Sequence, residues 1–370
     1  MKLRLSKETL LEQLTHVVGA VEKKHTSKIL ENILILATEN TLQLVGTDLE
    51  IEMSSTLDIQ AESAGQITAP ARKLFDICKA LPADCFILLE TDDNNRLHIK
   101  GVRSRFELAT LPADEYPLLD DIPIKQEINI PEKSLKQLME KVSFSMSNQD
   151  VRYYLNGLLL QFSGNKISAV STDGHRLAIS EYISPDDSKS DTDLKIIVPR
   201  KGILELSRLL DITSELPVTL QISDNHIRVN KDNIRFTSKL IDGKYPDYKA
   251  AIPAKSTYSI ELDREQFRDT LARVAILSNE KFKGIRLGFK EGVMTLHSNN
   301  PDNESAEEEI DINYSGDFFE IGFNVTYLLE AVNHLEGDSI KLDLSSPDTS
   351  ALLHSADDKN TRYVVMPIRL

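Results

Sequence analysis

His175, in STDGHRLAIS (171–180), is the histidine that most suggests a catalytic residue. A histidine that acts as a general base needs an adjacent nucleophile or acid, and the sequence nominates none. Asp173-Gly174 is itself a turn signal, which favours a hairpin with His175 and Arg176 on its rim. The hypothesis that the protein is an enzyme that uses His175 is kept as an alternative, but the missing nucleophile makes it the weaker one.

The sequence lacks other common chemical motifs. It contains no phosphate-binding or dinucleotide-binding glycine motif, no GxSxG and no HExxH. Its 8 histidines never occur two or four residues apart, so a metal site lacks support. The stretch 91–101 lacks the glycine and the distal glutamate of a calcium loop. We therefore expect no catalytic residue, no metal and no cofactor.

The composition is that of a globular protein with more than one domain. The chain has 370 residues, of which 41% are hydrophobic and 27% charged, and this length suggests two or three domains. No apolar run is long enough for a membrane span. Cys78 and Cys85 lack CxxC spacing, which is typical of a reducing compartment. We expect a cytoplasmic protein without membrane contacts.

One pattern of elements occurs three times, at an offset of roughly 125–130 residues. Each copy has two amphipathic helices separated by strands. The first helices are expected at 5–21, 130–146 and 262–278, and the second helices at 70–82, 198–211 and 323–337. The paired strands between them are expected at 32–37 and 42–50, at 156–162 and 167–175, and at 284–289 and 294–304. We predict three α+β domains of like fold, with bounds 1–125, 126–254 and 255–370.

The helices should cover one face of antiparallel sheet in each domain. Domains of like fold that join by their sheet edges would bury those edges. The chain ends on the apolar stretch YVVMPIRL (363–370). We expect 363–365 to complete the sheet of the third domain, and Pro367 to end the strand because proline cannot donate to a ladder.

Acidic residues outnumber basic ones, and the formal net charge is −15. This balance argues against a protein that grips nucleic acid over its whole surface. Basic pairs recur at the start of second helices, as Arg72-Lys73 in PARK and Arg200-Lys201 in PRKG. Because arginine there opposes the helix dipole, we predict that these side chains have another use, on a common basic face.

Long stretches of the sequence are similar, in order and from end to end, to the bacterial DNA polymerase III β subunits, the sliding clamps. These stretches include GTDLE (46–50), SRFELATLPADEYP (104–117), QDVRYYLNGLLL (149–160), TDGHRLA (172–178), FTSKLIDGKYPDY (236–248), AILSNEKFKGIRL (275–287) and YVVMPIRL (363–370). The resemblance implies a head-to-tail homodimer that forms a closed six-domain ring, with helices lining an inner face and sheets outside. Such a ring encircles duplex DNA without sequence preference. It is non-catalytic, tethers the DNA polymerase catalytic subunit and other proteins with clamp-binding motifs, and is loaded by an ATP-dependent clamp loader.

The resemblance also implies three sets of site residues. The residues expected to contact DNA are Lys24, Arg72, Gln149, Tyr153 and Tyr154, and the basic PRKG motif adds Arg200 and Lys201. A pocket for peptides with leucine and phenylalanine anchors is expected from Leu155, Thr172, Gly174, His175, Arg176, Leu177, Pro246, Ala251, Asn324, Tyr327, Val364, Met366, Pro367 and Arg369. At the dimer interface, Phe106 and Leu108 are expected to face Ile276 and Leu277, with Arg103 and Arg105 near Glu307, Glu308 and Glu309.

Some interpretations stay open at this point. Tyr153 and Tyr154 are either stacking platforms for exposed bases or two strand aromatics in the core. Ala251 occupies a position where a larger aliphatic wall is usual, which would loosen one subsite. The loop 22–28 lacks the proline that is usual before the Ile29-Leu30 pair, which leaves more than one shape open to it. A repeat-built protein-binding module without nucleic acid is the remaining alternative.

Overall fold

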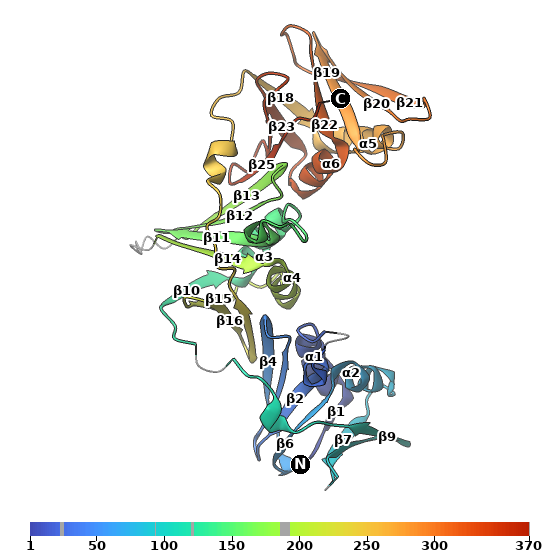
Figure 1. The fold of residues 1–370 in the computed structure, drawn as a ribbon, viewed down its shortest axis with the longest axis vertical. Helices are drawn as coiled ribbons and strands as arrows, with labels where there is room; N and C mark the ends of the chain where they lie inside the picture. The colour runs from blue at the N-terminus through green and yellow to red at the C-terminus, as the bar shows by residue number, and fades with distance from the viewer. Residues whose placement is uncertain (23–25, 93, 120–121, 186–192, 370) are drawn as a thin grey trace. The chain divides into compact units, whose positions relative to one another are not determined.

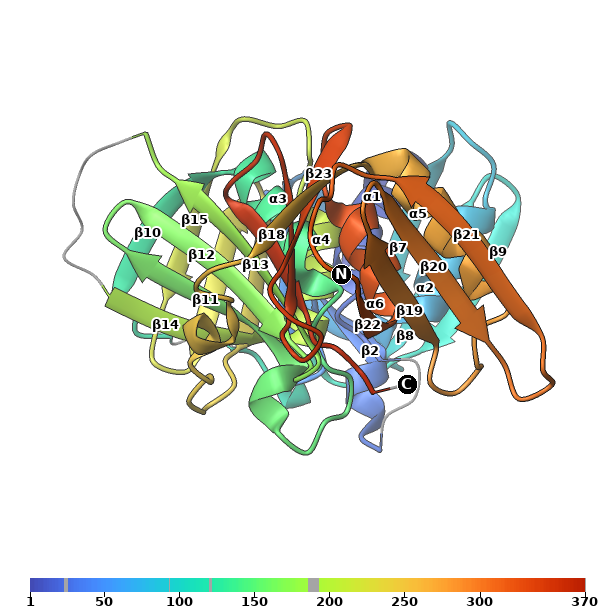
Figure 2. The same cartoon turned by 90° about the horizontal axis from the view of Figure 1, so that it is seen from above.

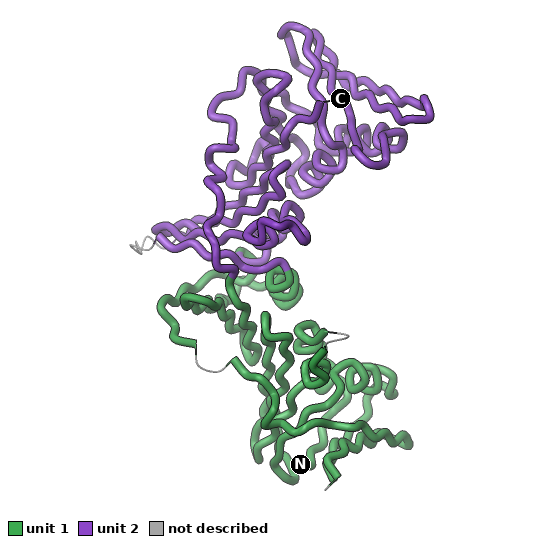
Figure 3. The backbone as a smooth tube through the Cα atoms, viewed as in Figure 1, with its two compact units in different colours: residues 1–134, 201–240 green, residues 135–200, 241–370 purple. Residues whose placement is uncertain are grey.

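The structure is a computed structural model that describes residues 1–22, 26–92, 94–119, 122–185 and 193–369. The chain forms two compact units (Figure 3). The first comprises Met1–Ser134 and Lys201–Leu240, and the second comprises Leu135–Arg200 and Ile241–Leu370. None of the helices in the described ranges is long and apolar enough to cross a membrane.

The first unit contains two antiparallel sheets. One has the order β5-β1-β7-β8-β9, with β5 (Ala61–Ser63), β1 (Lys2–Ser6), β7 (Phe86–Thr91), β8 (Arg96–Gly101) and β9 (Ser104–Ala109). The other has the order β10-β15-β16-β17-β4-β3-β2-β6. Its strands are β10 (Gln126–Pro131), β15 (Pro217–Ile222), β16 (His226–Lys231), β17 (Ile234–Lys239), β4 (Ile51–Asp58), β3 (Thr41–Thr47), β2 (Asn32–Ala37) and β6 (Gly65–Pro70).

Helices α1 (Lys7–Val18) and α2 (Ala71–Ala80) lie side by side in the first unit, and α1 packs against β3 and β4 (Figure 1). The side chain of Ser6 caps α1 by accepting a hydrogen bond from the Thr9 backbone N–H at 3.0 Å. The apolar face of α1 is buried, as its 3.6-residue periodicity predicts. The helix starts later than the expected residue 5 because Leu5 and Ser6 pair with β7.

The second unit also contains two antiparallel sheets. The larger has the order β14-β11-β12-β13-β25-β24-β23-β18. Its strands are β14 (Asp193–Pro199), β11 (Gly157–Ser163), β12 (Lys166–Thr172), β13 (Arg176–Ile183), β25 (Thr361–Val365), β24 (Ala351–Ser355), β23 (Ser339–Leu344) and β18 (Tyr258–Asp263). The smaller has the order β21-β20-β19-β22, with β21 (Ser305–Asp311), β20 (Val293–Asn299), β19 (Gly284–Lys290) and β22 (Phe319–Asn324).

Helices α5 (Arg264–Ala275) and α6 (Val325–His334) lie side by side in the second unit and pack against the smaller sheet (Figure 2). Two further helices, α3 (Glu132–Ser143) and α4 (Arg200–Leu209), each begin in one compact unit and continue in the other. Short 3₁₀ helices lie in the described connections, namely η1 (Lys28–Glu31), η2 (Ala113–Glu115), η3 (Tyr153–Asn156) and η4 (Tyr248–Ala251).

The predicted α+β class and the threefold repeat are confirmed. Helices α1, α3 and α5 lie within the expected first helices, and α2, α4 and α6 lie within the expected second helices. Each first helix is followed by an antiparallel strand pair, β2–β3, β11–β12 and β19–β20. The helices are shorter than the apolar periodicity suggested, and α1, for example, follows the strand residues Leu5 and Ser6 and ends at Val18.

Two strand pairs join repeats by their sheet edges. Strand β4 of the first repeat pairs with β17 of the middle repeat, and β13 of the middle repeat pairs with β25 of the last. The middle repeat therefore contributes strands to both eight-stranded sheets. This pairing satisfies backbone groups that isolated repeats would leave exposed. The division into two compact units runs through the middle repeat, so the bounds 1–125, 126–254 and 255–370 stay a prediction.

The apolar tail of the chain is a core strand. Tyr363, which is 1% exposed, lies in the middle of β25. Its hydroxyl lies 2.7 Å from the Lys141 carbonyl oxygen in α3 and 3.2 Å from the His334 carbonyl oxygen in α6, and its one hydrogen is shared between them. These oxygens belong to last helical turns, where carbonyls lack partners within the helix. The strand ends at Val365, before Pro367, as the sequence predicts.

Replacing Tyr363 by phenylalanine should lower the free energy of unfolding by about 1–2 kcal/mol, because two carbonyls that the hydroxyl satisfies would lose a donor. Urea denaturation followed by circular dichroism measures this change. Tyr182→Phe is the matched control, because the Tyr182 hydroxyl has no hydrogen-bond partner among the described residues and its loss should change stability little. Equal effects of the two substitutions would contradict the anchoring role of Tyr363.

Candidate peptide-binding pocket and the DNA and interface residues

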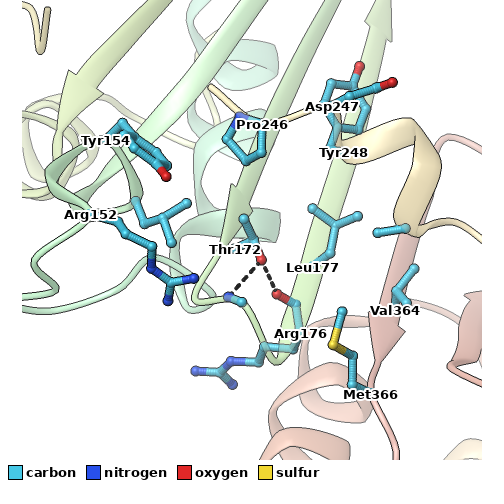
Figure 4. Close-up of a pocket in the computed structure, with 13 residues that line it drawn as sticks. Arg152, Tyr154, Thr172, Arg176, Leu177, Pro246, Asp247, Tyr248, Val364 and Met366 are labelled. Carbon is cyan, nitrogen blue, oxygen red and sulfur yellow. Dashed lines mark hydrogen bonds between the residues drawn. The ribbon is translucent and has the colours of Figure 1, made fainter. Parts of the chain in front are cut away.

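A pocket of about 200 Å³ lies in the second unit, between β13, β25 and the segment 246–251 (Figure 4). The register of β13 and β25 sets Leu177 opposite Val364, so both side chains lie on the same face of the sheet. Both also belong to a buried apolar cluster with Leu155. The residues that line the pocket are Arg152, Tyr154, Leu155, Thr172, Gly174, Arg176, Leu177, Pro246, Asp247, Tyr248, Ala251, Val364 and Met366.

The turn between β12 and β13 forms one wall and is held by its own side chains. The Thr172 hydroxyl accepts from the Gly174 N–H at 3.1 Å and donates to the Arg176 carbonyl oxygen at 2.6 Å (Figure 4). The Asp173 carboxylate accepts from the backbone N–H groups of His175 and Arg176 at 2.9 and 3.0 Å. Gly174 has φ +90°, a conformation that favours glycine. The wall is therefore preformed.

Arg176 holds this turn against the helices of the second unit. Its guanidinium lies 4.5 Å from the ring centre of Tyr327 and 5.3 Å from that of Phe144. It forms ion pairs with Asp173, at 3.0 Å, and with Glu330. Its side chain is 10% exposed, and desolvation by burial raises the pKa of neighbouring Tyr327. Arg176 is thus an inward-facing anchor, not the rim residue expected from the turn motif, whereas His175 is exposed.

The residues after β25 form the opposite wall. The Met366 N–H donates to the His175 carbonyl oxygen at 2.9 Å, and the Ile368 N–H donates to the Gly322 carbonyl oxygen at 2.8 Å. These two bonds hold the tail beside β13 and β22. Met366 is 38% exposed and lines the pocket. An unbranched thioether can adjust to apolar groups of different shape, so this wall suits more than one ligand.

The residues expected at the pocket omit four that line it, namely Arg152, Tyr154, Asp247 and Tyr248. Arg152 donates hydrogen bonds to the Asp150 carboxylate, which lower the pKa of Asp150 to about 2, and to the Asp173 carbonyl oxygen at 3.2 Å. The Tyr248 hydroxyl donates to Gln161 at 3.2 Å. The signal that was available for the last two was the run KYPDY (244–248), in which aromatic residues flank a proline.

Other residues expected at the pocket are not among those that line it, namely His175, Asn324, Tyr327, Pro367 and Arg369. The rings of His175 and Tyr327 stack with centres 6.5 Å apart. The Asn324 side chain caps α6 by accepting from the Thr326 N–H at 2.9 Å. Arg369 lines a separate hollow with Ile368, Phe282 and Arg286.

The pocket has the chemistry of a binding site. No nucleophile is hydrogen-bonded to His175 among the described residues, where its contact is with the Tyr327 ring. Within the same ranges, no group of three His, Cys, Asp or Glu side chains is placed to hold a metal ion. Apolar walls with a few fixed polar groups favour an apolar side chain carried by a ligand.

The residues expected to contact DNA fall into different environments. Arg72 and Lys73 are exposed in the first turn of α2, without ion pairs among the described residues. Arg200 instead donates to the Met146 carbonyl oxygen at 3.1 Å. Lys201 forms ion pairs with Asp48 and Glu22. Two basic residues of α5 are also paired, since Arg268 contacts Asp269 and Arg273 contacts Glu308.

Gln149, Tyr153 and Tyr154 lie in the connection before β11, and Lys24 lies outside the described residues. Gln149 is exposed with φ +59°. Tyr153 is 56% exposed in η3, so the interpretation of this residue as a core strand aromatic is wrong. Tyr154 packs against the apolar cluster and lines the pocket. The two rings meet edge to face, with centres 5.8 Å apart.

The residues expected at a dimer interface lie on or beside β9, on β21 and just after α5. Phe106 is 37% exposed on β9, whereas Leu108 is 7% exposed and belongs to the core of its own unit. Ile276 is 76% exposed just after α5, and Leu277 is half-buried. On β21, Glu308 contacts Arg273 at 2.7 Å and Glu309 contacts Lys290 at 3.0 Å. Glu307, Arg103 and Arg105 have no ion pair among the described residues.

The three like repeats, joined by their sheet edges and carrying an apolar pocket, define a protein of the DNA-clamp class. Models of the N-terminal, central and C-terminal domains of the DNA polymerase III beta subunit match residues 1–120, 129–247 and 249–369. The chain therefore belongs to the family of DNA polymerase III beta subunits, the sliding clamps.

Individual relatives agree along the whole chain. The beta sliding clamps of Pseudomonas putida and Escherichia coli are 44% and 42% identical to it, each over 100% of both chains. Among solved structures, a DnaN sliding clamp from Pseudomonas aeruginosa bound to griselimycin superposes with a TM-score of 0.94 at 42% identity, covering 100% of both chains. The Caulobacter crescentus clamp superposes with a TM-score of 0.95 at 36% identity, covering 100% of this chain and 99% of the other.

Substitution of Gly174 by alanine should weaken binding of a peptide with leucine and phenylalanine anchors about tenfold, because φ +90° disfavours a side chain. The new Cβ would also lie 3.0 Å from the Arg152 guanidinium. Fluorescence anisotropy measures the affinity. Gly164→Ala is the control, since Gly164 has φ +60° and open space around it. Unchanged binding by the Gly174 variant would show that the turn does not shape the pocket.

Proposed function

We propose that two copies of this chain close head to tail into a ring that encircles duplex DNA without sequence preference. The ring tethers the DNA polymerase catalytic subunit and other replication and repair proteins to their template. An ATP-dependent clamp loader opens and closes it, and the chain itself catalyses nothing. This activity takes place in the cytoplasm, at the nucleoid during replication.

Two uncovered sheet edges carry this proposal. Among the described strands, β9 pairs with β8 alone and β21 pairs with β20 alone. An exposed edge is a template for another strand, and these two edges differ in charge. Arg103 and Arg105 flank the first edge, and Glu307 lies on the second. Opposite charges around the apolar Phe106 and Ile276 favour pairing of unlike edges, which makes the dimer head to tail.

The proposed hold on DNA is topological. A closed ring does not need tight phosphate contacts, and weak ones that ignore sequence permit sliding. Arg72 and Lys73, which form no ion pair within the described part of the chain, would supply positive charge for such contacts, with Lys24, Gln149 and Tyr153 as further candidates. Arg200, Lys201 and Tyr154 were expected in the same role. Because these three side chains already make contacts within the chain, we expect them to contribute less to DNA binding. The net charge of −15 discourages DNA from binding elsewhere on the surface.

The proposed tether is the pocket. Its volume of about 200 Å³ suits one or two apolar side chains of a short partner peptide, held between Leu177 and Met366. Ala251 contributes a small side chain to the lining, which leaves room for a larger anchor such as phenylalanine. A preformed turn lowers the ordering cost of binding. Polymerase, clamp loader and other partners would therefore compete for one site.

Reversal of charge at Arg103 and Arg105 should dissociate the dimer and abolish retention on DNA. The Arg103→Glu, Arg105→Glu double variant places like charges opposite Glu307. Sedimentation velocity reports the monomer, and gel filtration after loader treatment reports protein retained on nicked circular DNA. The wild-type ring should be retained on circles and released when they are linearised. Lys239→Glu with Lys359→Glu, two exposed lysines elsewhere, controls for the change in net charge.

A triple variant that combines Arg103→Glu and Arg105→Glu with Glu307→Arg should form dimers again, because opposite charges then meet once more across the interface. A wild-type chain that stays monomeric at micromolar concentration, or retention that survives linearisation of the DNA, would contradict the ring. Retention absent in every case would favour a protein-binding module without nucleic acid.

Deletion of 366–370 should abolish binding of the leucine and phenylalanine anchor peptide while the dimer stays intact. The deletion removes the Met366 wall but leaves β25, which ends at Val365, in its sheet. Fluorescence anisotropy and sedimentation velocity measure the two properties. A deletion variant that unfolds or dissociates would show that the tail is structural, and one that still binds the peptide would refute the pocket.

A further inference from the structure

A second hollow, of about 490 Å³, adjoins the pocket in the same unit. The two share Pro246, Asp247 and Tyr248 as lining residues, so this stretch of chain separates one from the other. The floor of the second hollow is the outer part of the β11–β14 pair. Residues Gln161 and Lys195 lie opposite each other in this pair, as do Leu159 and Ile197. Their spacing of two residues places all four on one face of the sheet.

Three lysines line this hollow, Lys195 on β14 and Lys244 and Lys249 on the segment that covers it. We name them the lysine shelf. All three are exposed, and none forms an ion pair or side-chain hydrogen bond among the described residues. Asp247 is the one acidic lining residue, and its carboxylate accepts from the backbone N–H of Lys249 at 3.2 Å. Among the described residues that line this hollow, lysines therefore outnumber carboxylates three to one, in a chain of net charge −15.

The rest of the hollow provides a firm support for these charges. Leu159 and Ile197 are 2% and 4% exposed, and the Tyr248 hydroxyl ties the covering segment to Gln161. Lysine side chains offer three donors each on flexible stems, so they attract carboxylates without requiring one geometry. A ligand that already occupies the pocket would place its next residues beside Pro246 and Tyr248.

We propose that the lysine shelf binds acidic residues that flank the apolar anchors of a partner peptide. The occupant is an extended segment with aspartate or glutamate within a few residues of its leucine and phenylalanine anchors. This inference rests on the proposed peptide pocket and adds a second determinant of partner choice. The anchors provide the common attachment, and the acidic flank ranks partners by the charge that they bring to the shelf.

The test uses the full-length dimer and four synthetic peptides. One carries leucine and phenylalanine anchors alone, two add three aspartates before or after the anchors, and one adds three asparagines. Aspartates on one side should tighten binding roughly five- to twentyfold at low salt, because exposed charge pairs each contribute little and are screened. Asparagines should not tighten it. Anisotropy at low and physiological salt gives the affinities.

Two charge-matched variants locate the effect. The Lys195→Gln, Lys244→Gln, Lys249→Gln variant should lose the gain from aspartate yet bind the anchor-only peptide as the wild type does. The Lys79→Gln, Lys239→Gln, Lys359→Gln variant removes the same charge from exposed positions outside the hollow and should keep most of the gain. Equal losses in both variants, or no gain from aspartate on either side, would overturn the shelf.

A different result would show that the proposed peptide pocket itself is wrong. If the anchor-only peptide does not bind the wild-type dimer, the proposed function at this site and the shelf both fall. If a single-stranded oligonucleotide binds the wild type but not the shelf variant, while the aspartate peptides show no gain, the lysines serve nucleic acid and the inference is overturned.

Discussion

The candidate pocket depends on the antiparallel pairing of β13 with β25. This pairing sets Leu177 beside Val364 and leads the chain onward so that the Met366 N–H reaches the His175 carbonyl oxygen. A chain terminus usually frays because few contacts hold it. Here the burial of Tyr363 and its bonds to carbonyls of α3 and α6 stabilise the last strand. One segment is thus both a core strand and a binding surface.

Pairing between strands at sheet edges also joins the repeats to one another, and it leaves the edges of other strands without a partner strand among the described residues. Pairing of β4 with β17 and of β13 with β25 covers edges that would otherwise be open to solvent. Strands β9 and β21 keep an uncovered edge among the described residues. A chain of like repeats that joins by edges leaves such edges wherever the series stops. Two chains can then assemble by the same pairing of edge strands that joins the repeats within one chain.

The basic residues of this acidic chain differ in whether a carboxylate is bound to them. Arg176 and Lys201 are held by carboxylates within their own units, and they serve the fold. Arg72, Lys73 and the lysine shelf have no such partner among the described residues, and they stay available to ligands. The recurrence of PARK and PRKG predicts equal roles for their basic pairs. The structure separates the two pairs because Asp48 and Glu22 lie beside Lys201, whereas no carboxylate of the described residues forms an ion pair with Arg72.

By itself, the sequence determined the α+β class, the threefold repeat and the position of each α-helix in the described ranges. Apolar periodicity and caps are local properties, so they can be read without a partner strand. The resemblance to known sliding clamps indicated residues that line the pocket, such as Leu177 and Met366. Only the tertiary structure decided that Arg176 points inward, that Leu108 is core, and that Arg152 and Tyr248 line the pocket. These facts depend on which distant strands pair and on which charges meet, and no short stretch of residues encodes contacts between segments far apart in the chain.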